Sequence, residues 1–237
     1  MTAAHLEILG VEGIGEITPG VDLAETISGA LDDRSRLRDG DIVVVTQKVV
    51  SKAEGRLVRT DPDDPTGRRI VESESVRVLR RRGDLVISQT SHGFICANAG
   101  VDLSNVDDGW AALLPVDPDR SARRIRDGLR HHANVEVGVI VSDTFGRVWR
   151  RGVTDVAIGC AGIGAILDLR GTVDATGREL AVTEVAVVDE IASAAELVMG
   201  KATAIPVAIV RGIDRDWLRR GEVRAEIVRP AAEDLFR

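Results

Sequence analysis

The chain has 237 residues, enough to bury a sizeable core in one large domain or two small ones. Its hydrophobic share of 44% and charged share of 29% are typical of folded globular proteins, which argues against disorder, collagen or coiled coil. A net charge of -7 and an aromatic share of 3%, with no Tyr, disfavour nucleic acid as a partner, because the charge repels a phosphate backbone and few rings can stack on bases.

The sequence contains no segment typical of a membrane span or of a secretory signal. The longest mostly apolar run, Val156 to Leu167, is shorter than the roughly 18 residues that cross a bilayer. The first residues contain no basic stretch before their apolar positions, so they do not resemble a secretory signal. We therefore expect a cytoplasmic protein with no membrane contact. Cys96 and Cys160, far apart and outside any C-x-x-C motif, are expected to be buried free thiols.

Strands and helices are predicted to alternate along the first half of the chain. The pattern predicts a strand over residues 6–9, a helix over 23–31, a turn over 38–41, a buried strand over 42–45, a linker over 61–65, a helix over 66–81, and strands over 85–88 and 93–97.

The second half continues the alternation. Asp119 is expected to cap a helix over 120–132, followed by a strand over 135–141, a strand over 183–188, a helix over 190–199 and a strand over 206–210. The fold class predicted is α/β, of the mixed α+β kind. Without a fixed repeat or a clear boundary, residues 1–237 are expected to form one domain. The run Val156 to Leu167 is too apolar to be exposed in a soluble monomer, so we expect it in the core or in a dimer interface.

Three polar clusters follow predicted buried strands, and ligand sites usually form where loops leave strand ends. Taken singly, each cluster is typical of a turn or a helix cap. Together their carboxylate, amide and hydroxyl oxygens suit a hard cation, while lysine and arginine suit phosphate, a combination that predicts a metal-dependent enzyme acting on an anionic substrate. The clusters are Lys48, Ser51 and Lys52; Asp102, Ser104 and Asn105; and Ser142, Asp143, Thr144 and Arg147.

The common nucleotide-binding signatures are absent from the sequence. No G-x-x-x-x-G-K-[ST] motif occurs, so a P-loop is not predicted. The third glycine of G-x-G-x-x-G would fall on Thr18 after Gly13 and Gly15, and on Leu167 after Gly162 and Gly164. A Rossmann dinucleotide site is therefore not predicted either.

Four segments of the chain carry a specific resemblance to a known family. Residues 40–55, 92–105, 143–147 and 206–212 are similar to motifs of the coenzyme F-420-0:L-glutamate ligases, γ-glutamyl ligases that add glutamate to a deazaflavin redox coenzyme. The likeness extends from the first strand to Arg229-Pro230 and is strongest to the N-terminal half of an actinobacterial version, in which a nitroreductase-like, flavin-binding domain follows. Whether such a domain accompanies this chain is left open by the sequence.

The resemblance implies a family-specific α/β fold, possibly of two intertwined subdomains, and a homodimer. It also implies GTP as co-substrate and two divalent metals per subunit, Mg²⁺ or Mn²⁺, with K⁺ as a further candidate. The site residues that it implies are Ile14, Gly15, Glu16, Ile17, Gln47, Lys52 and Asn105 at the nucleotide, Asp102 and Asp143 at the first metal and Thr144 at the second, with Lys52 and Asp143 as catalytic residues.

The implied reaction is GTP-dependent addition of L-glutamate to coenzyme F-420-0 through an acyl phosphate, forming GDP. Arg147 or Arg150 is a candidate for a substrate carboxylate, and Lys201 occupies a place where archaeal relatives are expected to have an amide or an acid. Two alternatives remain open: an amide ligase for a different acid or amino acid, and a nucleotide-binding regulatory or assembly module that docks a separate reductase.

Overall fold

A computed structural model describes residues 5–104 and 106–235. No helix in this part of the chain is long and apolar enough to cross a membrane. The helices and strands, in chain order, are β1 (Glu7–Val11), α1 (Leu23–Ala30), β2 (Ile42–Thr46), α2 (Gln47–Ala53), β3 (Leu57–Arg59), α3 (Arg68–Glu74), β4 (Ser75–Arg82), β5 (Leu85–Thr90), β6 (Ile95–Ala97), β7 (Trp110–Ala112), α4 (Pro118–Ala133), β8 (Gly138–Arg147), β9 (Arg150–Ala161), β10 (Leu167–Asp168), β11 (Glu184–Val185), α5 (Val187–Met199), β12 (Val207–Arg211) and α6 (Val223–Glu226), with 3₁₀ turns at Asn98–Gly100, Arg215–Trp217 and Ala231–Glu233.

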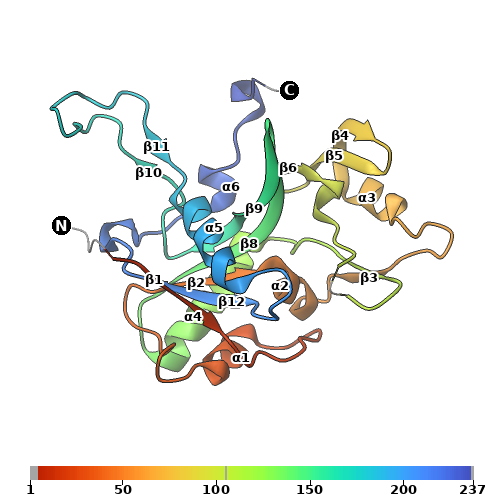
Figure 1. The fold of residues 1–237 in the computed structure, drawn as a ribbon, viewed down its shortest axis with the longest axis horizontal. Coiled ribbons are helices and arrows are strands. Elements are labelled where there is room, and N and C mark those ends of the chain that lie inside the picture. The colour runs from red at the N-terminus through yellow and green to blue at the C-terminus, as the bar shows by residue number, and fades with distance from the viewer. Residues whose placement is uncertain (1–4, 105, 236–237) are drawn as a thin grey trace.

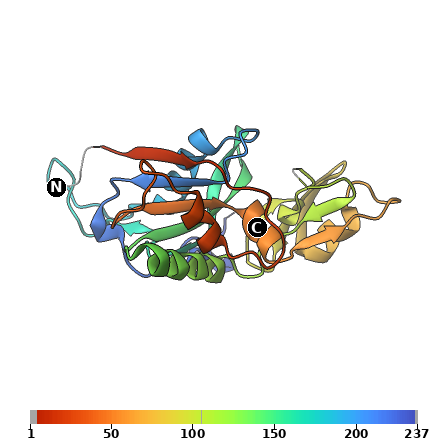
Figure 2. The same cartoon turned by 90° about the horizontal axis from the view of Figure 1, so that it is seen from below.

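A five-stranded sheet in the order β1-β12-β2-β8-β9 forms the centre of the molecule (Figure 1). The strands β2 and β8 run parallel, and the other neighbours are antiparallel. Helices α1 and α4 pack on one face and α5 on the other, as Figure 2 shows. With both faces covered, the residues of β2 from Ile42 to Val45 are 0% exposed, the result expected for an unbroken β-branched run. The mixed α/β prediction is confirmed.

Strands β8 and β9 continue past the sheet as a long hairpin, seen in green in Figure 1. The pairing shifts register between Val141 and Ser142, where the hairpin leaves the sheet. Its turn is formed by Val148 and Trp149, and Trp149 has a left-handed backbone with φ of 64°. The inner half of β9 and the loop after it are buried in the core, where Ile158, Cys160 and Ile163 are at most 1% exposed. This stretch is therefore core, one of the two outcomes expected for it.

Beside the sheet, the segment from β3 to β7 forms a small lobe with its own three-stranded sheet, β4-β5-β6, and a β3-β7 pair (Figure 2). The helix predicted over residues 66–81 is wrong in its second half, because α3 ends at Glu74 and β4 follows. In β4, Val76 and Val78 alternate with Arg77, a period of two that suits a strand paired with β5. Because α3 is also rich in charged residues, the sequence did not show where the helical period ends and the strand period begins.

The start of α4 also differs from the prediction. Asp117, not Asp119, is the N-cap, and its carboxylate accepts from the backbone N–H of Arg120 at 3.0 Å, with Pro118 as the first helical residue. The carboxylate of Asp119 is buried and accepts from the backbone N–H groups of Cys160 at 2.8 Å, Val223 at 2.8 Å and Arg224 at 3.1 Å. Asp119 therefore ties α4 to β9 and α6, which no local pattern predicts.

The structure corrects one smaller prediction and confirms another. The strand predicted over residues 183–188 is only the short β11, because α5 already begins at Val187, three residues before the predicted helix start. Cys96 and Cys160 are both free and buried, as predicted. Burial raises the pKa of the Cys96 thiol to about 12, so this thiol stays protonated and unreactive at neutral pH.

Candidate active site

The parallel pairing of β2 with β8 places two of the polar clusters at the same edge of the sheet. Thr46 at the end of β2 lies opposite Ser142 in β8, so α2 and the outer part of β8 both start from this edge. The third cluster comes from the lobe, where the backbone of Asp102 is bonded to that of Ala112, N to O at 2.9 Å and O to N at 2.8 Å. The ammonium of Lys48 in α2 lies 2.9 Å from the Asp102 carboxylate and donates to the Ser104 hydroxyl at 3.0 Å.

Asp143 completes a first group with Asp102 and Lys48, which we call the Asp102 group. Burial raises the pKa of Asp143 to about 7, and repulsion from the carboxylates of Asp102 and Asp155 adds to the rise. Burial also acts to raise the pKa of Asp102, but the hydrogen bonds from Lys48 and Ser104 outweigh it and hold that pKa below its usual value. Lys48 thus keeps Asp102 ionised, while Asp143 lies where an added cation would relieve repulsion.

A second group lies around Asp155 of β9, directly opposite Thr144 of β8. The Asp155 carboxylate is 2% exposed and accepts from the Thr144 hydroxyl at 2.6 Å and from the Ser142 hydroxyl at 3.2 Å. Lys201, in the loop after α5, lies 2.9 Å from Asp155 and 2.8 Å from Glu196 of α5. We call Ser142, Thr144, Asp155, Glu196 and Lys201 the Asp155 group.

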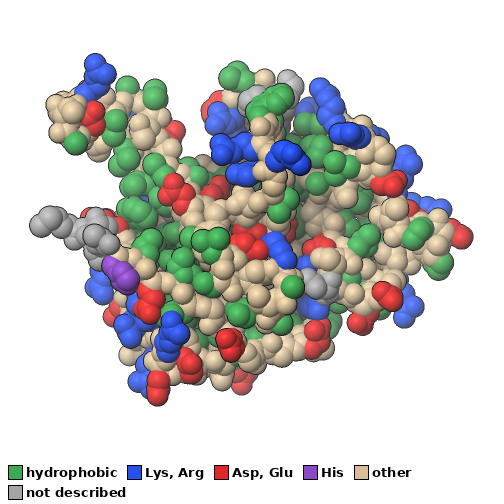
Figure 3. All heavy atoms as spheres, in the orientation of Figure 1, with side chains coloured by type: hydrophobic (Ala, Val, Ile, Leu, Met, Phe, Trp, Pro, Cys, Tyr) green, Lys and Arg blue, Asp and Glu red, His purple; other side chains and the backbone are tan. Residues whose placement is uncertain are grey.

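The two groups lie on opposite sides of β8. Successive side chains of a strand point to opposite faces, so Ser142 and Thr144 lie on the face covered by α5 while Asp143 and Phe145 lie on the face toward the lobe. The edge-on contact of Phe145 with Phe94 of the lobe, with centroids 6.1 Å apart, agrees with this. Figure 3 shows acidic and basic side chains gathered in the hollowed middle of this face, beneath the hairpin.

The oxygen atoms of these groups are the ligand type that Mg²⁺ and Mn²⁺ take. Within residues 5–104 and 106–235, no three His, Cys, Asp or Glu side chains form a ready-made metal site. The carboxylates are instead divided between the two sides of β8 and mixed with hydroxyls and lysines. Such an arrangement fits cations that take their remaining ligands from water, or from the phosphate oxygens of a substrate when one is bound.

The residues assigned to the nucleotide lie around α2 and the loop after β1. Lys52, whose side chain is 13% exposed, forms an ion pair with Glu16, so the structure brings Lys52 to the Ile14–Ile17 loop. Ile14 is partly buried, Gly15 is exposed and Ile17 is buried. Asn105 lies outside the described residues.

Gln47 is 1% exposed, and its amide nitrogen donates to the Ser51 hydroxyl at 2.8 Å and to the Leu113 carbonyl at 3.1 Å. These bonds occupy the amide in joining α2 to the lobe. Contact of Gln47 with a nucleotide stays a prediction.

Comparison with known proteins identifies the family. Residues 13–212 match the family described as F420-0:Gamma-glutamyl ligase. This chain belongs to that family. A protein of Methanothermobacter thermautotrophicus named coenzyme F420:L-glutamate ligase is 41% identical over 98% of this chain and 99% of its own length. Proteins with the same name from Methanopyrus kandleri and Methanocaldococcus jannaschii are 43% identical over 94% of both chains, and 37% identical over 98% of this chain and 97% of the relative.

In this member of the ligase family, the two candidate substrate arginines lie at the outer end of the β8–β9 hairpin. Arg147 pairs in register with Arg150, both are exposed, and Arg147 donates to the carbonyl of Arg151 at 3.0 Å. Both arginines therefore lie on the same strand pair as Asp143 and Asp155, toward its outer end.

Asp155 and Glu196 are the site residues that sequence reasoning missed in this ligase. Asp155 lies within an apolar strand, and only the register that sets it opposite Thr144 marks it as a partner. Glu196 lies in the last turn of α5, among residues that resemble an ordinary amphipathic helix.

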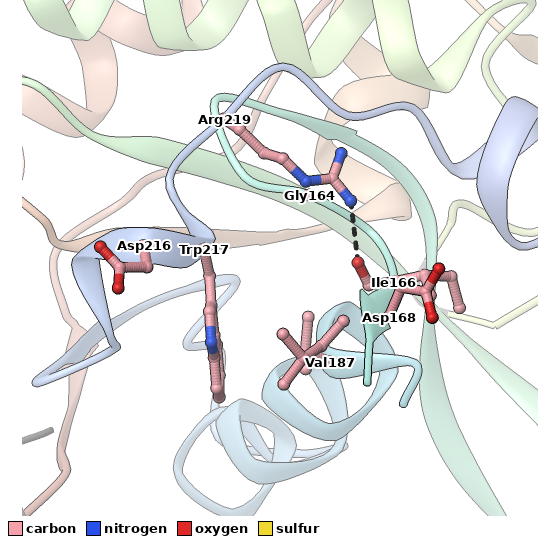
Figure 4. A pocket seen from close by; sticks show the side chains of 8 residues that line it. Gly164, Ile166, Asp168, Val187, Asp216, Trp217 and Arg219 are labelled. Carbon is pink, nitrogen blue, oxygen red and sulfur yellow. Dashed lines mark hydrogen bonds between the residues drawn. The ribbon is translucent and has the colours of Figure 1, made fainter. Parts of the chain in front are cut away.

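A separate pocket of about 210 Å³ lies between the 3₁₀ turn Arg215–Trp217 and the start of α5 (Figure 4). Trp217 and Val187 line it, and Arg219 closes one side while donating to the Ile166 carbonyl and the Glu226 carboxylate, both at 2.8 Å. Its lining includes none of the residues of the Asp102 or Asp155 groups, so we do not assign it to the reaction.

Proposed function

We propose that this protein is a GTP-dependent ligase that adds L-glutamate to coenzyme F-420-0 and extends its γ-linked glutamate tail, forming GDP. The family membership and the names of the relatives support the substrates. The observation that carries the chemistry is the meeting of Asp102 from the lobe with Lys48 of α2 and Asp143 of β8, beside the parallel pair of β2 and β8. The two buried free thiols agree with a reducing, cytoplasmic location.

Amide formation needs an activated acid, because a carboxylate does not expel an oxide leaving group when an amine attacks. In the proposed reaction, a carboxylate oxygen of F-420-0 attacks the γ-phosphorus of GTP and the bond to the β-phosphate oxygen breaks, giving an acyl phosphate and GDP. The glutamate amine then attacks the acyl carbon, the C–N bond forms, and phosphate leaves with the original carboxylate oxygen. A base takes the proton that the amine loses.

Divalent cations, Mg²⁺ or Mn²⁺, would neutralise charge on the transferring phosphoryl group. Asp102 and Asp143 would hold the first cation. The resemblance assigns Thr144 to a second, and K⁺ is a further candidate. Lys48 fixes Asp102 in its ionised state, and Lys52 would contact the phosphates from α2, near the Ile14–Ile17 loop. Arg147 or Arg150 would bind a carboxylate of the substrate.

We also propose a homodimer. Its support is the outer hairpin, where Val148, Trp149 and Val153 are 67%, 87% and 62% exposed in the single chain. Apolar side chains this exposed are typical of a surface that another protein covers. A monomer mass in light scattering at micromolar concentration would contradict this proposal.

The test of the ligase is incubation of the protein with F-420-0, GTP, L-glutamate and Mn²⁺ or Mg²⁺, with the products read by mass spectrometry. We expect product heavier by one or more glutamyl residues, and none when GTP or the metal is left out. Folded protein that binds GTP but forms no amide would favour a regulatory module instead. Release of GDP with another acid or amino acid, but not with F-420-0 and glutamate, would favour a different amide ligase.

Lys52→Met should weaken GTP binding by at least tenfold without unfolding the protein, because its ammonium is held near the nucleotide loop. Isothermal titration with GTP measures the change. Glu16→Gln is the matched variant: it removes the ion-pair partner and leaves the cation, so binding should be kept or strengthened. Wild-type affinity in folded Lys52→Met would contradict the assignment of Lys52 to the nucleotide, and an equal loss in Glu16→Gln would show that binding needs the ion pair and not the cation alone.

A further inference from the structure

The ammonium of Lys201 lies among oxygen atoms from three different elements. It is 2.9 Å from a carboxylate oxygen of Asp155 in β9 and 2.8 Å from one of Glu196 in α5, and it donates to the Thr144 hydroxyl in β8. A full positive charge therefore occupies the centre of the Asp155 group.

The atoms around this ammonium are those that a small divalent cation would take. Asp155 is 2% exposed and the Glu196 side chain 19% exposed, so bulk water solvates both carboxylates poorly and a nearby positive charge stabilises them. A metal ion would need the same oxygens of Asp155 and Glu196 as the lysine. The two cations therefore compete and cannot bind there together. The Lys201 ammonium is attached to the chain two residues beyond the end of α5. Its effective concentration at the Asp155 group is therefore high and does not depend on the metal concentration.

The Asp102 group is not filled in the same way. Lys48 contacts Asp102 and Ser104, but no lysine or arginine within the described residues forms an ion pair with Asp143. One further positive charge is favoured on that side of β8, whereas on the other side both carboxylates already contact one ammonium. The two sides of the strand therefore differ in their need for a metal ion.

We infer that Lys201 is a built-in cation of the active site, so that this chain binds one divalent cation per subunit, at the Asp102 group, and none at the Asp155 group. The inference rests on the proposed function for the first cation and revises the number of two implied by the resemblance. Lys201 then supplies, as a fixed charge beside Thr144, the neutralisation that a second metal ion would otherwise provide. The other two lysines of the chain, Lys48 and Lys52, have the separate contacts described above.

The test is a titration of the full chain with Mn²⁺ alone, followed by electron paramagnetic resonance of the free ion, with folding checked by circular dichroism. Wild type should bind one Mn²⁺ per chain. Lys201→Gln removes the charge and should bind two, the second at least tenfold more tightly than any further site in wild type. Lys201→Arg keeps the charge and should bind one, and Lys201→Gln with Asp155→Asn should return to one.

Each result decides between the alternatives. Two comparable Mn²⁺ sites in wild type, or one site in both wild type and folded Lys201→Gln, would overturn the inference and leave the ligase reaction intact. No Mn²⁺ bound by wild type would also overturn it. The proposed function fails separately, by absence of glutamylated F-420-0 in the incubation described above.

Discussion

Asp143→Asn should reduce turnover by several orders of magnitude, equivalent to about 3–5 kcal/mol in the barrier. The substitution removes a negative charge from the Asp102 group, where the first cation is proposed to bind, and it puts an amide N–H₂ in its place. A helix-cap role, the alternative for this residue, is excluded by its position within β8. Steady-state assays of glutamylated F-420-0 at saturating metal measure the effect, with the exposed Asp127→Asn as the control.

The same variant should not lose stability in the metal-free protein. Burial and the neighbouring carboxylates of Asp102 and Asp155 disfavour the ionised form of Asp143, so replacing it with a neutral amide relieves repulsion in the folded state. The free energy of unfolding should therefore stay level or rise. Near wild-type turnover in Asp143→Asn would end its assignment as a metal ligand, and a large fall in stability would instead make it a structural residue.

Asp119→Ala should destabilise the fold by roughly 3–5 kcal/mol, because it leaves three backbone N–H groups, those of Cys160, Val223 and Arg224, without their acceptor. The matched variant is Asp117→Ala, which removes only the N-cap bond to Arg120 and should cost about 1 kcal/mol. Urea unfolding followed by circular dichroism compares the two. Equal losses, or a larger loss in Asp117→Ala, would restore Asp119 to the simple capping role that the sequence suggests.

The apolar strands and their order of alternation with helices were accessible from the sequence because burial on both faces leaves long β-branched runs. The runs Ile42–Val45 and Val137–Val141 are of this kind, and the polar residues after them marked the site edge. The parallel register of β2 with β8 explains why clusters nearly 100 residues apart meet, since Thr46 lies opposite Ser142.

The residues that were not predictable act through contacts distant in sequence. Asp119 is read as a cap from its neighbours, yet its partners Val223 and Arg224 lie more than 100 positions away. Asp155 and Glu196 become site residues only when β9 pairs with β8 and α5 packs across the sheet. Local patterns contain no information on these pairings. The sequence therefore gives the members of the Asp102 group but, of the Asp155 group, only Ser142, Thr144 and, through the resemblance, Lys201.

The most direct test of the central claim, activation of the acid by phosphoryl transfer, is to follow the oxygen atoms. F-420-0 labelled with ¹⁸O in its acceptor carboxylate is converted with GTP, L-glutamate and metal, and the phosphate and GDP are analysed by mass spectrometry. An acyl phosphate predicts that one labelled oxygen appears in the inorganic phosphate and none in GDP, in proportion to the amide formed. Amide formed with unlabelled phosphate, or with the label in a nucleotide product, would contradict the account.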